Sequence, residues 1–195
     1  MTDSPIRAGR VMRSSTGEFT IGTHLLQADV PSFGAFVKAP SPDGGEVIGL
    51  IYDVLVEDDP FVRQMIGADV KEEYIRDHRE NRQVPAMVSV LVIGHRRDGR
   101  ILPYLPPLPP AALDTLVTCT DDEIVAFTED FTYFRTVLNA VNARPDELLA
   151  ASLRHAAGAR PGGGREFLIR AGRELARLLA FDAVRLEGLL RRIKP

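Results

Sequence analysis

The 195-residue sequence has no tryptophan and only one cysteine, Cys119. A single cysteine excludes an internal disulfide and a cysteine-rich metal site, and it is typical of a reducing cytoplasm. No apolar run approaches the roughly 18 residues that would span a bilayer, and the first residues lack the basic start and apolar stretch of a secretion signal. We therefore expect a cytoplasmic protein that does not enter a membrane.

The sequence also lacks the common catalytic motifs. Its four histidines are His24, His78, His95 and His155. They are far apart and show no metal-ligand spacing. The glycine cluster at 162–164 is followed by Arg165, not by the lysine and hydroxyl residue of a phosphate-binding loop. No serine lies in a Gly-x-Ser-x-Gly elbow. These absences predict a protein that is not an enzyme and holds neither a cofactor nor a metal.

Two acidic runs and the cysteine are the remaining candidates for chemistry. Residues 57–59 and 121–123 are all acidic and have the ligand type of a divalent-cation site. However, the first run ends a predicted strand and the second opens a predicted helix, which accounts for both without a metal. Cys119 ends an apolar strand, where a free cysteine usually behaves as a small buried hydrophobe.

The first half of the chain has the pattern of a small β-barrel. Residues 9–15 and 18–24 predict a hairpin with Gly17 at its turn. Strands are also predicted at 33–39, 46–56, 86–95 and 116–120, with a turn at 97–100 leading into a short arm at 101–102. Gly49, inside the apolar strand 46–56, indicates a bulge or a barrel corner. The charged stretch at 61–83 predicts a helical excursion from the barrel.

From residue 121 the apolar period changes from two to about 3.6. Thr120 is the predicted N-cap of a first helix, and further helices are expected at 131–141, 145–157 and 164–193. Asp182 interrupts the last of these and is a candidate cap for a separate final helix. The predicted fold class is therefore α+β: an antiparallel barrel over 8–120 followed by an all-α region of three or four helices over 121–195.

Charge divides the chain in the same way. Residues 1–134 hold 12 Lys and Arg against 21 Asp and Glu, whereas residues 135–195 hold 12 against 6. Such an asymmetry marks either a basic interaction segment or two halves that pack on each other. The candidate nucleic-acid-binding residues are Arg170, Arg173, Arg177, Arg191 and Arg192. Nearby glutamates weaken the positive field of these arginines. A leucine-rich stripe lies beside them, and three alternatives could cover it: the chain's own helices, another subunit or a partner.

The order of these segments resembles the HAS barrel, the N-terminal barrel of HerA-type DNA-translocating ATPases and ATP synthase subunits. The resemblance covers residues 8–120. It is carried by the Gly9-Arg-Val strand, the turn at 14–17 with Phe19 after it, and the segments 36–38, 47–53 and 88–94. The proline-rich run 103–110 then leads into Leu116. One departure is that Pro110 is followed by Ala-Ala-Leu, where the ATPases place a Pro-Gly pair.

The resemblance implies a stand-alone barrel without the ATPase domain, used for contacts between subunits and with partner proteins. The function we expect is that of a non-enzymatic docking or assembly subunit, with a HerA-type ATPase or a NurA-type nuclease as partner. The alternative is a nucleic-acid-binding protein that acts through the basic C-terminal helices. The proline run also resembles ligands of SH3 and WW domains, although a rigid connection across the barrel accounts for it more simply. Apolar stripes at 45–56 and in the C-terminal helices further predict a homo-oligomer.

Overall fold

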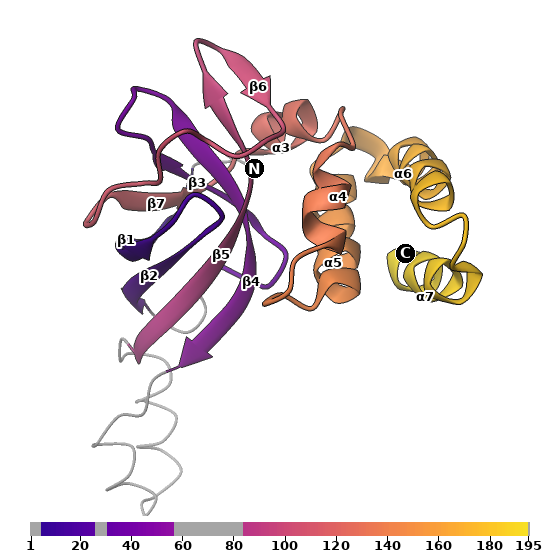
Figure 1. The fold of residues 1–195 in the computed structure, drawn as a ribbon, viewed down its shortest axis with the longest axis horizontal. Coiled ribbons are helices and arrows are strands. Elements are labelled where there is room, and N and C mark those ends of the chain that lie inside the picture. The colour runs from indigo at the N-terminus through magenta and orange to yellow at the C-terminus, as the bar shows by residue number, and fades with distance from the viewer. Residues whose placement is uncertain (1–4, 26–30, 57–83, 195) are drawn as a thin grey trace, which may run out of the picture.

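The computed structural model describes residues 5–25, 31–56 and 84–194. Its strands form one antiparallel sheet that closes into a barrel, and its helices follow on one side of that barrel (Figure 1). The predicted α+β architecture is confirmed. The helical excursion predicted at 61–83, which contains His78, lies outside the described residues, as does the acidic run at 57–59.

Six strands close the barrel in the order β2-β1-β7-β3-β4-β5, and β2 pairs with β5 to complete it. The short β6 extends β5 as a hairpin. The strands are β1 (Arg7–Ser14), β2 (Glu18–Leu25), β3 (Phe36–Pro40), β4 (Glu46–Val56), β5 (Val84–Arg97), β6 (Arg100–Leu102) and β7 (Thr115–Thr118). The predicted strand at 33–39 begins only at Phe36, because Ala35 N–H donates to Ser32 O in a preceding turn.

Gly49 lies at a β-bulge, one of the two features that its sequence context predicts. The register between β4 and β5 shifts at Ile48 and Gly49. A Cβ atom at position 49 would lie 2.4 Å from Val90 Cγ1 and 2.8 Å from Leu91 O. Only glycine lets β4 approach β5 so closely at this bulge.

The helical region has five α-helices, not the three or four predicted. They are α3 (Asp121–Phe127), α4 (Tyr133–Leu138), α5 (Pro145–Gly158), α6 (Arg165–Leu178) and α7 (Ala183–Ile193), with the 3-10 turn η2 (Pro161–Gly164) before α6. The count differs because Asp182 accepts a hydrogen bond from Arg185 N–H and starts α7 as a separate helix. The helix predicted at 131–141 is shorter, over α4 alone. Thr120 caps α3, as expected, in a reciprocal capping box with Glu123.

Two apolar cores support this arrangement. One fills the barrel with side chains such as Phe19, Ile21 and Ile51. The other joins the outer side of the barrel, at Phe36 and Leu50, to the helices, whose C-terminal leucine-rich stripe it includes. Among the alternatives for that stripe, burial by the chain's own helices is confirmed. In the described residues no helix is long and apolar enough to cross a membrane.

Candidate interaction surfaces

Arg170, Arg173 and Arg177 lie along one side of α6, as predicted. Arg170 Nη1 is 3.1 Å from Glu129 Oε2, in the loop after α3. Arg177 Nε donates to Glu174 Oε2 at 2.9 Å. These hydrogen bonds raise the pKa of both arginines above the usual value. Arg173 is exposed and forms no ion pair with any described residue.

The two predicted arginines of α7 are also paired. Arg191 Nη2 lies 2.5 Å from Glu187 Oε1 on the same helix, and Arg192 Nε lies 2.7 Å from Glu147 Oε1 of α5. Four of the five predicted residues therefore have a carboxylate partner that neutralises much of their field.

The α6 and α7 arginines are not brought together. Glu147 is in the first turn of α5, whereas Glu129 also pairs with Arg160, which follows the last turn of α5. The 14 residues of α5 span about 20 Å. Arg170 and Arg192 consequently approach opposite ends of this helix, and the five arginines do not form one continuous basic patch.

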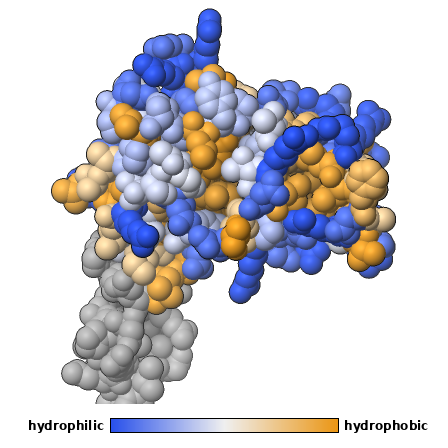
Figure 2. All heavy atoms as spheres, viewed as in Figure 1, coloured by the Kyte–Doolittle hydropathy of each residue, from blue (hydrophilic) through white to orange (hydrophobic). Residues whose placement is uncertain are grey.

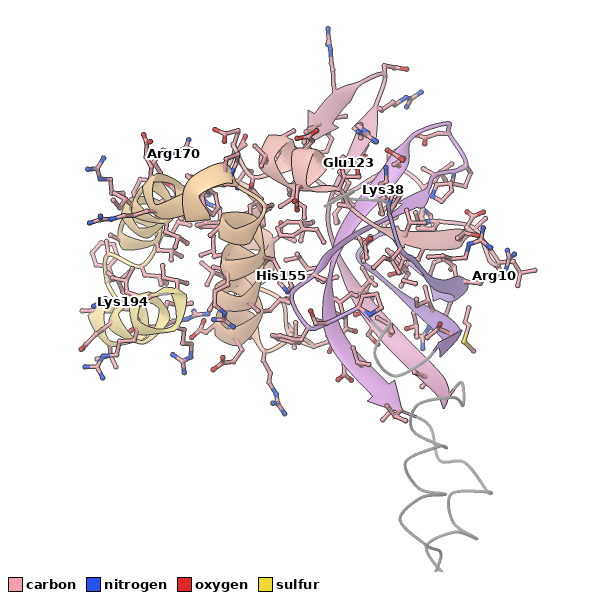
Figure 3. The ribbon with its side chains drawn as sticks, turned by 180° about the vertical axis from the view of Figure 1, so that it is seen from behind. Arg10, Lys38, Glu123, His155, Arg170 and Lys194 are labelled. Atoms are coloured by element: carbon pink, nitrogen blue, oxygen red, sulfur yellow. The ribbon has the colours of Figure 1, made fainter. Side chains whose placement is uncertain are left out.

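A half-buried ion cluster joins the barrel to α3, and Figure 3 shows two of its members, Lys38 and Glu123, side by side. Lys38 Nζ is 2.5 Å from Glu123 Oε1 and 3.1 Å from Glu46 Oε1. Arg96 Nη2 is 2.9 Å from the same Glu123 oxygen and also pairs with Glu46. Burial opposes ionisation of Glu123, but hydrogen bonds from Lys38 and the Thr120 N–H lower its pKa below the usual value.

The composition and surroundings of this ion cluster do not fit a metal site or a small-molecule site. Its two cations match its two carboxylates, and the described residues include no group of three or more metal-ligating side chains. The cavity beside it, lined by Cys119, measures about 30 Å³, whereas a small-molecule pocket needs roughly 300 Å³ or more. Cys119 is buried, and burial raises the pKa of its thiol to about 12. The prediction that Cys119 behaves as a buried hydrophobe is confirmed.

Two histidines hold loops in place. His95 Nδ1 is 3.0 Å from Tyr104 O, which attaches the proline-rich segment to β5. His155 Nε2 is 3.3 Å from Ser32 Oγ, in the loop before β3. Burial lowers the pKa of His155 below its usual value. The side chain of His24, like the whole of His78, lies outside the described residues.

An open cleft of about 610 Å³ lies between the start of α4 and α6. Its carboxylates already have partners. Glu129 binds Arg160 and Arg170, Glu174 binds Arg177, and Asp130 accepts from the Thr132 N–H and hydroxyl. The carboxylates of the cleft are thus already occupied by partners within the chain.

The proline-rich segment forms an exposed apolar ridge across the barrel. It connects β6 to β7, and its side chains alternate with a period of three: Pro106 is buried and Pro103 and Pro109 are half-buried. The large apolar side chains between them face solvent, together with one from the following turn, and 46% to 70% of their surface is exposed. We define these residues as the apolar ridge: Tyr104, Leu105, Leu108 and Leu113.

The ridge is anchored to the barrel close to both of its ends. Besides the His95 contact, Ser14 Oγ donates to Pro110 O at 2.7 Å, and Leu113 N–H donates to Val11 O at 2.8 Å. The interpretation of the prolines as a rigid connection across the barrel agrees with these bonds. Figure 2 shows apolar surface at the outer rim, where the turn before β7 lies in Figure 1.

Leu113 has a left-handed backbone conformation, with φ of 71°. This conformation favours glycine and is strained for leucine. It occurs in the loop where the sequence departs from the Pro-Gly pair of the HAS-barrel ATPases. Leu113 thus combines an exposed apolar side chain with a backbone conformation that suits glycine.

Sequence reasoning missed a row of arginines on β1. Relative to β7, β1 has one extra residue at Ala8, and relative to β2 it has another at Met12. Strict alternation would turn Arg10 to the opposite side from Arg7 and Arg13. The two bulges change the phase, so that all three are exposed while Ala8 and Val11 are buried. We define Arg7, Arg10 and Arg13 as the arginine row.

Glycine at position 9 permits the first bulge. Gly9 has a φ of 149°, and a Cβ atom there would lie 2.6 Å from Gly22 O. Figure 3 labels Arg10 on the barrel side remote from α5, α6 and α7. A glycine next to an arginine is the only sequence signal of this geometry, and it does not locate the second bulge.

No protein-family model matches this chain, and no curated protein does.

Proposed function

We propose that the protein is a non-enzymatic docking subunit of the cytoplasm that binds another protein through the apolar ridge of its barrel. The ridge carries this proposal, because its four large apolar side chains are exposed together on a segment held by hydrogen bonds to β1 and β5. A rigid apolar surface loses little conformational freedom on binding, so that burial of its side chains contributes directly to affinity.

The resemblance to the HAS barrel supplies the partner to test first. A HerA-type ATPase or a NurA-type nuclease would place the protein in DNA processing, and the closed six-strand barrel is compatible with that resemblance. The barrel alone does not identify the family, since barrels of this size occur in unrelated proteins.

Biolayer interferometry with the purified ATPase and nuclease encoded in the same genome tests the proposal. We expect one of them to bind the intact chain with micromolar or tighter affinity. Replacement of Leu105 and Leu108 by serine should weaken binding at least tenfold, about 1.4 kcal/mol. The matched control replaces Val141 and Val184 by serine, since both are exposed apolar residues of the helical region.

Binding that is unchanged in the ridge variant, or equally weakened in the control, would contradict the use of the ridge. If neither protein binds, the assignment of the partner is wrong.

A further inference from the structure

We propose that the arginine row on β1 binds the phosphate backbone of duplex nucleic acid. The row adjoins the ridge, because Arg10 donates to Leu113 O, but its test does not depend on the ridge partner proposed above. Arg7, Arg10 and Arg13 follow one another at intervals of three residues on one extended strand. The Cα atoms of neighbouring arginines in the row are therefore about 10 Å apart, and their guanidinium groups form a linear series of cations along the barrel.

The charges of the row are available to a ligand. None of the three arginines forms an ion pair with a carboxylate within the described ranges. Among their side chains, Arg10 alone has a hydrogen bond there, from its Nη1 to Leu113 O at 2.9 Å. Arg170, Arg177, Arg191 and Arg192, in contrast, would each have to leave a carboxylate before binding a phosphate. Arginine is suited to phosphate because its planar fork donates two parallel hydrogen bonds.

Two carboxylates in segments bonded to or paired with β1 form hydrogen bonds with other groups. Asp114, in the turn bonded to Val11, accepts from Ala111 N–H at 2.8 Å. Glu18 of β2 accepts from Tyr52 of β4 and from Asn142 of the α4–α5 loop. Neither forms an ion pair with the row within the described residues. Because their partners are neutral, both keep their charge and, together with the net charge of −3 for the whole chain, limit long-range attraction of a polyanion.

The surrounding surface favours the backbone of a duplex over a single strand. Proteins that bind single strands stack bases on aromatic side chains. β1, β2 and β7 contain a single Phe, Tyr or Trp residue. This residue is Phe19, and it is buried inside the barrel. Three arginines without a stacking platform contact phosphates and do not read the sequence. We therefore expect binding that is weak, independent of sequence and sensitive to salt.

Fluorescence anisotropy with a labelled 30-base-pair duplex of mixed sequence tests this proposal on the full chain. Three phosphate contacts predict a slope of about −2.7 in log K against log salt, or roughly a 40-fold loss of affinity between 50 and 200 mM KCl. The variant R7Q/R10Q/R13Q should lose at least tenfold at 50 mM KCl. Each single variant should reduce the slope by about one, which keeps the test valid if the triple variant does not fold.

The matched control is R144Q/R165Q/R173Q, which removes three exposed arginines of the helical region that have no ion pair within the described residues. It should bind as the parent does, within about twofold. Absence of duplex binding at 50 mM KCl would overturn the proposal, as would an equal loss in both triple variants. A loss in the control alone would move the site to the helices. Binding of poly-glutamate but not of the duplex, lost in the β1 variant, would assign the row to an acidic protein instead.

Discussion

Lys38 of β3 donates a hydrogen bond to Glu123 of α3, with its Nζ 2.5 Å from Oε1. The same glutamate accepts from the Thr120 N–H at 3.0 Å and thereby completes the capping box of the helix. One side chain thus starts the helical region and attaches it to the barrel. The helix dipole favours a carboxylate at this position as well.

Glu123→Gln should lower the free energy of unfolding by about 1–3 kcal/mol at neutral pH, because the half-buried Lys38 and Arg96 lose a charged acceptor. Since folding lowers the pKa of Glu123, its contribution is present above the unfolded value of about 4.3. It is lost as pH falls through the lower folded value. Urea unfolding at pH 7 and at pH 3 measures the difference.

The control is Glu187→Gln, which removes the exposed partner of Arg191 and should change stability by less than about 0.5 kcal/mol. A difference between parent and Glu123→Gln that is as large at pH 3 as at pH 7 would mean that the ionised carboxylate is not the stabilising species.

Leu113→Gly should separate stability from binding. Glycine relieves the left-handed strain at this position, about 1–2 kcal/mol, while extra freedom of the unfolded chain offsets about 0.4–1 kcal/mol. We expect the free energy of unfolding, measured by thermal denaturation, to rise by about 0.5–1 kcal/mol. Binding of the ridge partner should become weaker. Leu108→Gly is the control, since its φ is not positive and its stability should fall. A loss of stability in Leu113→Gly would show that its side chain packs in the fold.

Gly49→Ala should destabilise the barrel by about 2 kcal/mol or more, because the new methyl group would overlap Val90 and Leu91 of β5. Gly17→Ala is the matched control, as a Cβ atom there meets nothing within 4 Å. Chemical unfolding of both variants compares them directly. Equal stability of the two would mean that the β4 bulge relaxes without loss.

Most of the two apolar stripes that predicted a homo-oligomer is buried within one chain, whereas Leu55 and Val56 of β4 remain about half exposed. Val47, Ile48, Leu50 and Ile51 of β4 are buried, and so are Leu175, Leu189 and Ile193 of the C-terminal helices. We therefore expect light scattering at micromolar concentration to give the mass of one chain, 21.5 kDa. A dimer that persists on dilution would require another surface, and the ridge variant would then test whether that surface is the ridge.

Most elements of this fold follow from local patterns. The hairpin at Gly17, the strand 46–56, the helix starts at Thr120 and Pro145 and the cap at Asp182 are each specified by residues within a few positions. The Gly49 bulge was also predictable, because an isolated glycine in an apolar strand often marks a bulge or a close approach of two backbones. The shorter α4 and the later start of β3 were not, since turns and helix ends depend on contacts with distant segments.

The sequence by itself determined the change from strands to helices at residue 121, the burial of Cys119 and the acidic and basic halves of the chain. Only the tertiary structure decided which charges are neutralised. It placed glutamates beside four predicted arginines and left Arg7, Arg10 and Arg13 without carboxylate partners among the described residues. The physical reason is that ion pairs and bulges depend on the alignment of segments far apart in the chain, whereas hydrophobic periodicity is a property of each segment alone.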